Sequence, residues 1–398
     1  MRAAIVFDCV FPATSGGGER VYTRIADELV ARGVTVDYLT RELGAPADAG
    51  FRVVPVWDGE IYDSGGNRTT ASALRFALGV FRHLRRHRGD YDIVIGSTLP
   101  ALTILAARVA LVGSRTFLVA DWLEVWPWRK WRSYAGVVTG TLGFALQVVS
   151  ARVGDLHTVN SLFTAGRLGR YRRTPAPLVL GLIDLVPPAP AGDTGARGLT
   201  RGEVPPAEAA DPAPPPVVLF VGRHIPDKRA TAIPAAMVAL RRAHPLASAT
   251  IVGSGPETAA IERAIEAAGA AGFVALAGRV DDEDLERMLR GAAVLLNPSV
   301  REGFGLVVAE AASHGTPSIV VAGEDNAAAE LVQDGVNGFV VASADADELA
   351  GGLAAAIDGG ATLRRTTLDW FDRERVEHSL SRSVDEILVR YRAARASD

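Results

Sequence analysis

The sequence predicts an α/β fold of two facing Rossmann-like domains, each built on a doubly wound parallel sheet. Short β-rich runs alternate with helical periods along the first half, and the same alternation restarts at residue 217. Strands that alternate with helices are typical of parallel sheets covered by helices on both faces. With 398 residues, 48% of them hydrophobic, the chain also exceeds the roughly 250–300 residues at which one core usually divides. We therefore expect two domains with a cleft between them.

The expected elements set the domain limits. In the first half we expect strands at 3–7, 34–40, 51–56, 92–97 and 116–120 and helices at 18–33 and 71–87. The pattern stops between 187 and 216, where nine prolines and almost no large apolar residue predict a linker or an exposed loop. In the second half we expect strands at 217–222, 248–253, 274–278, 294–299, 317–323 and 338–343. The predicted parts are thus 1–186, 187–216, 217–365 and a helical segment, 366–398, that crosses back to the first domain.

Composition excludes several classes of protein. The net charge of −4 gives no basic field for a nucleic-acid partner, and the single cysteine, Cys9, excludes an intramolecular disulfide and a cysteine-rich metal site. The first residues read as a strand rather than a signal peptide, so we expect a cytoplasmic protein. Two apolar runs, 101–113 and 135–150, are shorter than the roughly 20 residues that span a membrane. We expect buried helices there, with adsorption to a membrane surface as the alternative.

A glycine cluster precedes the first predicted helix. Glycines such as Gly17 and Gly18 let the backbone approach a ligand, and a helix N-terminus attracts an anion. The dinucleotide fingerprint fails here, because Val21 occupies its third glycine position, as Thr258 does in the second half. A phosphate site and an ordinary glycine turn both remain open.

Two cations follow the first strand of the second half. Arg223 and Lys228 lie just past that strand, at the edge where parallel sheets bind ligands. Lys228 is one of only two lysines in a chain that otherwise uses arginine. A compact, rotatable charge of this kind suits a pyrophosphate, whereas the alternative is a solvated loop with two surface cations.

Glu302 and Glu310 bracket a glycine-rich loop that enters an apolar helix. The N–H groups of Gly305, Leu306 and Val307 are the unpaired donors of a helix start and suit a phosphate. A carboxylate can also accept two hydrogen bonds from a sugar diol. The alternative makes Glu302 a capping residue and Glu310 a surface charge.

Four of the six tryptophans lie between residues 122 and 131, directly after Asp121 at the end of a predicted strand. Aromatic faces and cations could form an acceptor platform, a packed aromatic helix or a patch that docks on anionic lipid. We favour the acceptor platform, and its predicted residues are Trp122, Glu124, Trp126 and Trp128.

Several motifs together carry a family resemblance. They are VGRHIPDK, IVGSGPE, the run from AGRVDDEDL to GTPSIV with its E-x7-E at Glu302 and Glu310, and AAAELVQDGVNGFVV. In order and spacing, from about 217 to 345, they resemble the donor domain of the family-4 retaining glycosyltransferases of GT-B fold (glycosyl transferases group 1). The GGGER start and the LDWFDRERVEHSLSRSVDEI end resemble that family's acceptor-domain start and closing helix.

The resemblance implies a role for each matching residue. Arg223 and Lys228 would hold the donor diphosphate, Glu310 the ribose, and Glu302 would face the transferred sugar. Asp121 stands where many relatives have a histidine. Relatives often have an Asn-Gly-Val-Asp turn near residue 184, and of these four residues only the aspartate, Asp184, is present here. The implied catalytic residues are Glu302, Asp121, Arg223 and Lys228. The implied donor-binding residues also include Gly17, Gly18, Gly253, Arg279, Val280, Gly303, Phe304, Gly305, Leu306, Val307 and Glu310.

The function implied is transfer of a sugar from a nucleoside diphosphate to an acceptor hydroxyl with retained configuration, by a front-face mechanism. No metal and no cofactor are expected, and the partners are the nucleotide sugar and a glycan, glycolipid or natural-product aglycone, with peripheral membrane contact as a further expectation. Two alternatives stay open: a nucleotide-sugar epimerase or dehydrogenase, and a non-catalytic protein that binds sugar nucleotides.

Overall fold

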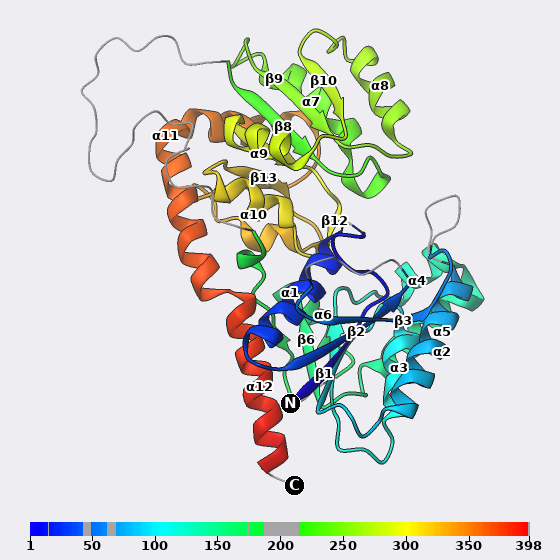
Figure 1. Cartoon of the computed structure of the whole chain (residues 1–398). Helices are drawn as coiled ribbons and strands as arrows, with labels where there is room; N and C mark the ends of the chain where they lie inside the picture. The colour runs from blue at the N-terminus through cyan, green and yellow to red at the C-terminus, as the bar shows by residue number, and fades with distance from the viewer. Residues whose placement is uncertain (15, 43–48, 62–68, 173–174, 187–214, 397–398) are drawn as a thin grey trace. The chain divides into compact units, whose positions relative to one another are not determined.

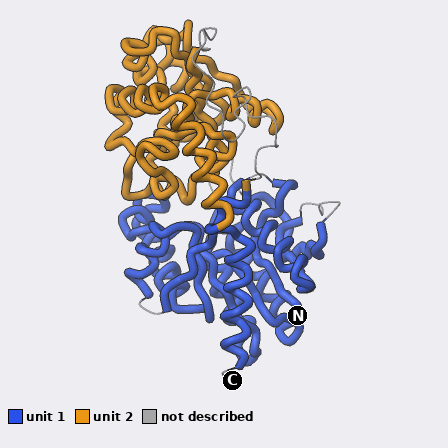
Figure 2. The backbone as a smooth tube through the Cα atoms, turned by 90° about the vertical axis from the view of Figure 1, so that its left-hand side faces the viewer, with its two compact units in different colours: residues 1–185, 377–398 blue, residues 186–376 orange. Residues whose placement is uncertain are grey.

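A computed structural model describes residues 1–14, 16–42, 49–61, 69–172, 175–186 and 215–396. The chain divides into two compact units, residues 1–185 with 377–398 and residues 186–376 (Figure 2). Each unit has a parallel sheet flanked by helices, which confirms the predicted fold class. The linker predicted at 187–216 lies, apart from its last two residues, outside the described residues.

The first unit is built on a seven-stranded parallel sheet in the order β3-β2-β1-β4-β5-β6-β7. Because β1 has β2 on one side and β4 on the other, the strand order reverses at β1, as it does in doubly wound sheets. The strands are β1 Arg2–Val6, β2 Thr35–Arg41, β3 Arg52–Trp57, β4 Ile93–Ser97, β5 Phe117–Trp122, β6 Leu156–Val159 and β7 Leu178–Val179.

Helices cover this sheet on both faces (Figure 1). Helices α2 and α3 pack against each other and over one face, where Phe76 and Ile104 join strand residues such as Val6 and Leu118 in one core. Helix α1 packs with α12. The helices are α1 Gly17–Ala31, α2 Thr70–Arg86, α3 Ala101–Ala110, α4 Trp128–Ala135, α5 Val137–Ser150, α6 Leu162–Leu168 and α12 Leu380–Ala396, with a 3-10 turn, η1, at Ile183–Leu185.

The second unit has a six-stranded parallel sheet in the order β10-β9-β8-β11-β13-β15, and a separate two-stranded sheet pairs β12 with β14. The strands are β8 Val217–Val221, β9 Ser248–Val252, β10 Val274–Gly278, β11 Val294–Asn297, β12 Arg301–Glu302, β13 Ser318–Val321, β14 Asp325–Asn326 and β15 Gly338–Val341. The helices are α7 Ile233–Leu240, α8 Thr258–Ala267, α9 Asp282–Gly291, α10 Leu306–Ser313 and α11 Ala346–Glu377, with 3-10 turns η2 Pro226–Lys228, η3 Ala230–Ala232 and η4 Ala327–Leu331.

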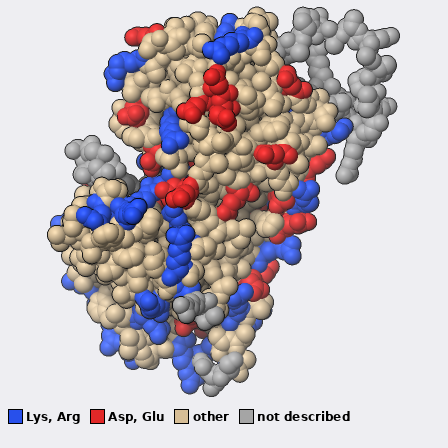
Figure 3. Space-filling view, turned by 180° about the vertical axis from the view of Figure 1, so that it is seen from behind, with Lys and Arg blue, Asp and Glu red and all other residues tan. Residues whose placement is uncertain are grey.

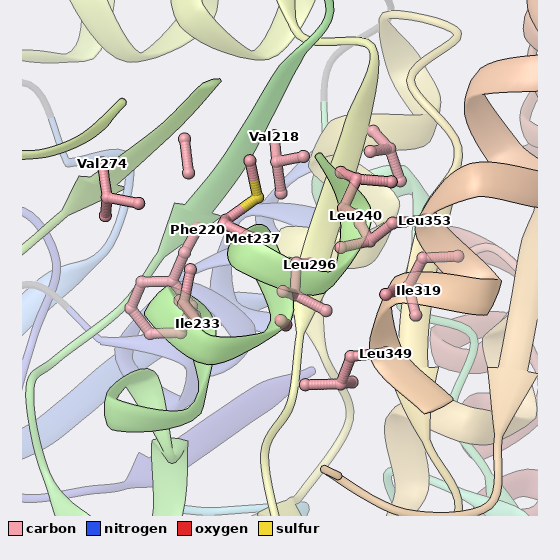
Figure 4. Packing of buried hydrophobic residues seen from close by; sticks show 14 of the residues in the cluster. Val218, Phe220, Ile233, Met237, Leu240, Val274, Leu296, Ile319, Leu349 and Leu353 are labelled. Carbon is pink, nitrogen blue, oxygen red and sulfur yellow. The ribbon is translucent and has the colours of Figure 1, made fainter. Parts of the chain in front are cut away.

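Successive residues of the central strands point into two different cores. Val218 and Phe220 of β8 pack with α7, α8 and α11 (Figure 4), whereas Leu219 between them packs with α9 and α10. Such alternation follows from the two-residue period of a strand, and continuously apolar strands are expected where both faces are buried. Both faces of the sheet are thus packed against helices, and the loops at its carboxyl edge start from this packed layer.

The helical segment predicted at 366–398 is not one continuous helix. The chain breaks at His378 and Ser379, between α11 and α12. The break is stabilised by Asp184, whose carboxylate accepts a hydrogen bond from the Leu380 N–H (2.6 Å) and so caps α12. Arg32 of α1 then holds α12 through Asp385 (2.7 Å). These contacts tie residues 380–396 to the first unit.

Candidate functional site

The candidate site of the second unit lies where adjacent strands end at the carboxyl edge of its sheet. Arg223 follows β8, Gly253 follows β9, Arg279 and Val280 follow β10, and Glu302 follows β11. Since these four strands are neighbours in the order β10-β9-β8-β11, the predicted donor-binding residues share one edge. Ligands of open α/β sheets bind at this edge.

The loop after β8 presents Lys228 at the end of the short turn η2. Its ammonium group donates a hydrogen bond to Glu302 Oε1 and forms an ion pair with it, and both side chains are largely shielded from solvent. Arg229, which follows, has φ 49° and is the one non-glycine residue with positive φ among the residues described. Such backbone conformations are rare and concentrate at functional sites. Arg223 in the same loop is exposed.

Glu302 is held by three donors. Besides Lys228, Ser299 donates its hydroxyl (3.0 Å) and Asn297 its amide (3.3 Å) to the same carboxylate oxygen. Asn297 and Ser299 are themselves buried at the end of β11. The carboxylate therefore has a fixed position before any ligand binds, which is how binding sites are preorganised.

A second set of contacts fixes the backbone around Glu302. Strand β12 pairs with β14, Arg301 forms an ion pair with Asp227 (3.3 Å), and the Val300 N–H donates to the Asp227 carbonyl (2.9 Å). Asn326 of β14 donates to the Ser299 carbonyl (3.0 Å). The Lys228 loop and the Glu302 strand are thus joined at both backbone and side-chain level.

Helix α10 begins beside this strand without a side-chain cap. Gly305 is its N-cap residue, with φ 95°, and a Cβ there would lie 2.5 Å from the Ala328 Cβ, so only glycine fits. The helix start offers backbone donors and the positive end of a dipole. Glu310 lies in the second turn of α10, half-buried. Glu302 and Glu310 therefore come from two elements, as we expected, with Gly303, Phe304, Leu306 and Val307 between them.

In the first unit, Gly17 and Gly18 open α1, directly after β1 and its loop. Asp121 lies in β5, at 1% exposure, and accepts hydrogen bonds from the hydroxyls of Tyr22 and Thr158, both at 2.5 Å. Burial raises the pKa of the Asp121 carboxyl to about 6. Each carboxylate oxygen accepts a hydrogen bond from a buried hydroxyl, so Asp121 links α1 to the sheet through Tyr22. Its catalytic role stays a prediction.

The tryptophan segment is mainly packed, which corrects part of the acceptor prediction. Trp122 is 1% exposed and donates to His157 Nδ1 (2.9 Å), so its ring has no free face for stacking on a ligand. Trp126 is 9% exposed and donates its indole N–H to Glu124. Trp128 alone of the predicted platform exposes its ring substantially.

One group of side chains among the described residues could hold a metal ion. Glu374, Glu377 and His378 bring ligand atoms within 4.8 Å of one another at the junction of α11 and α12. Two of the three are exposed, and acidic groups at a surface gather in this way without a metal.

Sequence reasoning missed Asn297 and Ser299. Their signal was weak but present, because polar residues directly after the apolar strand β11 stand at the carboxyl edge of the sheet. Buried polar side chains need partners, and here the partner is the carboxylate of Glu302.

Comparison with known proteins assigns both units. The model for Glycosyltransferase Family 4 matches residues 15–180, and that for Glycosyl transferases group 1 matches residues 206–367. A D-inositol 3-phosphate glycosyltransferase of Segniliparus rotundus is 27% identical over 406 residues, which covers 95% of this chain and 85% of the relative.

Two solved structures share the fold. The sucrose-phosphate synthase of Thermosynechococcus elongatus superposes with a TM-score of 0.76 at 18% identity, with complete coverage of both chains. An Anabaena HepE protein in complex with UDP gives a TM-score of 0.69 at 16% identity, covering 98% of this chain and 100% of that one. With both family models matched in order along most of the chain, this protein belongs to the family-4 glycosyltransferases of GT-B fold.

Proposed function

We propose that this glycosyltransferase takes its sugar from a nucleoside diphosphate sugar and transfers it to an acceptor hydroxyl with retained anomeric configuration, without a metal ion. The observation that carries the proposal is the ion pair of Lys228 with Glu302 beside the uncapped start of α10. A cation, a helix N-terminus and an oriented carboxylate are the groups that a sugar diphosphate needs around its leaving group and its sugar.

Each residue has a defined part in the proposal. Arg223 and Lys228 bind the diphosphate and neutralise the charge that develops as it leaves, which is why no metal is needed. The backbone from Gly303 to Val307 donates to the distal phosphate and the sugar. Glu310 accepts from the ribose hydroxyls, and Glu302 faces the transferred sugar.

The remaining predicted contacts complete the donor site. Backbone at Arg279 and Val280 meets the base, and Gly253 lets the chain approach the donor closely. In the first unit, Gly17 and Gly18 at the start of α1 are proposed to bind an anionic group of the ligand. The departing diphosphate itself accepts the acceptor's proton, since the described residues at this edge include no side chain placed as a dedicated base. The UDP in the HepE complex supports a nucleotide donor.

The acceptor is a hydroxyl on a glycan, a glycolipid or a natural-product aglycone. The Segniliparus relative is named for an inositol phosphate, which supports a polyhydroxylated acceptor. The family assignment sets aside the epimerase and dehydrogenase alternative. An activity assay distinguishes an enzyme from a non-catalytic protein that binds sugar nucleotides.

The test is a two-stage assay on the full chain. Thermal shift with a panel of nucleoside diphosphate sugars selects the donor, because a ligand at a hundredfold its Kd adds about 2.7 kcal/mol to the free energy of unfolding. Transfer and donor hydrolysis are then measured with EDTA present, and NMR of the product gives the anomeric configuration. Binding without transfer or hydrolysis would show a non-catalytic protein, and inversion or loss of activity in EDTA would overturn the corresponding part of the proposal.

A further inference from the structure

Helices α4 and α5 form a hairpin whose outer side is apolar. Four apolar residues of α5 are exposed to solvent: Val138 (82%), Leu142 (59%), Ala145 and Val149 (50%). Their spacing of four, three and four residues places them on one stripe of the helix. No residue of α5 is charged. The sequence-based expectation of a buried helix here is therefore wrong, because this stripe faces solvent.

The inner side of α5 is the more polar one. Gln147, which is buried, accepts from the Trp126 N–H and the Trp131 indole (both 3.0 Å) and donates to the Trp126 carbonyl (2.8 Å). Gly143 allows the Trp131 ring to lie against the helix, because a Cβ there would come within 2.6 Å of the ring. A helix of a water-soluble surface normally has the opposite arrangement, with its polar side outward.

The segment that carries this stripe has basic residues and no acidic ones between Glu124 and Asp155. Residues 125–154 contain Arg129, Lys130, Arg132 and Arg152 and no aspartate or glutamate, in a chain of net charge −4. Arg132 lies over the Trp128 ring at 4.6 Å, so its charge is held beside an exposed indole. Seen from behind, the side of the first unit on which α4 and α5 lie shows basic groups set in an uncharged surface (Figure 3).

Helix α3, which packs against α5, also has exposed apolar residues at its end. Val109 and Val112 at its end are exposed, and Arg108 and Arg115 beside them are basic and exposed. We call this combined surface, formed by the exposed residues of α4, α5 and the end of α3, the α4–α5 face. Exposed apolar residues that lie together on one helix, with basic neighbours, can mark an interaction site.

We propose that the α4–α5 face docks on an anionic lipid bilayer, with the α5 stripe lying in the plane of the interface and the basic groups on lipid phosphates. Interfacial helices combine an apolar stripe, basic neighbours and aromatic rings at headgroup level, and Trp128 and Tyr134 are the exposed rings here. At 14 residues α5 can lie on a bilayer, and none of the helices in the described ranges has the length and apolar character to cross one.

Charge decides between a bilayer and a second copy of the chain. In a symmetric dimer the same patch meets itself, so the basic residues would face one another with no acidic partner. An anionic bilayer supplies the opposite charge and attracts basic residues that lie near its surface. If the proposed transfer reaction holds, docking by the unit that matches Glycosyltransferase Family 4 favours an acceptor hydroxyl carried on a lipid.

The test is sedimentation of the full chain with vesicles of phosphatidylcholine, with and without phosphatidylglycerol. We expect binding to the anionic vesicles, weakened by salt, and at least a tenfold loss of binding in the double variant Val138→Glu/Leu142→Glu. The matched control is Val389→Glu/Leu246→Glu, which adds the same two charges at exposed positions of α12 and of the loop before β9. The control should bind vesicles like the parent, and both variants should keep the parent's melting temperature.

Other outcomes overturn the proposal. A parent that does not sediment with anionic vesicles, or a test variant and control that bind equally, would show that the face does not dock on lipid. A parent that is dimeric by light scattering and becomes monomeric in the test variant would assign the face to a second copy. Vesicle binding is measured without a sugar donor. Its outcome is therefore independent of whether the proposed transfer reaction occurs.

Discussion

Lys228 and Glu302, 74 residues apart in the sequence, form an ion pair at the carboxyl edge of the second sheet. The pair joins the loop after β8 to strand β12, so it sets the position of both the cation and the carboxylate. A lysine ammonium has three N–H donors, so in the proposed donor complex Lys228 can bind the diphosphate while it stays paired with Glu302.

Removal of either cation should weaken donor use. For Lys228→Ala and Arg223→Ala we expect donor affinity or kcat/KM to fall at least tenfold, because a hydrogen bond to a charged group contributes about 1.5–3 kcal/mol. Isothermal calorimetry with the donor and initial rates provide the measurement. Arg242→Ala is the matched control, since Arg242 is an exposed arginine of the same unit that pairs with exposed Asp347. Parent-like kinetics in both site variants would remove the diphosphate assignment.

Substitutions of the two glutamates should affect the binding of different ligands. Glu310→Gln should weaken binding of the free nucleoside diphosphate and of the sugar donor alike, because both carry ribose. Glu302→Gln should leave the free nucleotide's affinity near that of the parent and reduce kcat. Calorimetry with nucleotide and with donor distinguishes them, and equal effects of both variants on free nucleotide would contradict the separate roles.

Gly305→Ala should displace the start of α10. The substitution places a side chain at φ 95° and brings its Cβ within 2.5 Å of the Ala328 Cβ. Gly335→Ala is the control, because Gly335 also has positive φ (73°) but an added Cβ there would have no atom within 4 Å. Both variants should lose about 1–2 kcal/mol from the left-handed backbone. Only Gly305→Ala should also lose donor affinity, and equal affinity in the two would show that the α10 start does not contact the donor.

The sequence predicts the second unit better than the first. Strands such as β10 and β15 are short apolar runs that begin or end next to glycines, so the sequence around them is enough to predict them. In the first unit, β6, α6 and β7 escaped prediction because they are short, and short elements depend on tertiary contacts more than on their own pattern. The break at His378 also depends on a distant residue, Asp184, which no local pattern reveals.

The candidate site could also be predicted only in part. The alternation of strands and helices predicts parallel strands, whose carboxyl ends share one edge, and so predicts that Arg223 and Lys228 lie at that edge. The order of the strands comes from the structure. The burial of Trp122 and the exposure of the α5 stripe could not be predicted in this way, because an apolar or aromatic residue looks the same in a sequence whether it faces a core or solvent. Which of the two it faces is decided by the packing of elements that lie far apart in the chain.

Asp121→Asn should stabilise the protein in a pH-dependent way. The pKa of Asp121 is raised from 3.8 to about 6, chiefly by burial, so the folded state binds this proton more tightly than the unfolded state. Stability contributed by the protonated carboxyl is fully present below pH 3.8 and is lost as the pH rises to about 6, at a total cost of roughly 3 kcal/mol. Asparagine has no charge to bury, and its amide can still meet Tyr22 and Thr158. The variant's advantage in melting temperature should therefore grow between about pH 4 and 6 and stay constant above. A constant difference in melting temperature across this range would contradict a buried Asp121 carboxyl with a raised pKa.

The same variant also tests whether Asp121 takes part in catalysis. If kcat falls more than a hundredfold while the melting curves coincide, Asp121 takes a direct part in transfer, because a residue that only positions α1 through Tyr22 would change stability first.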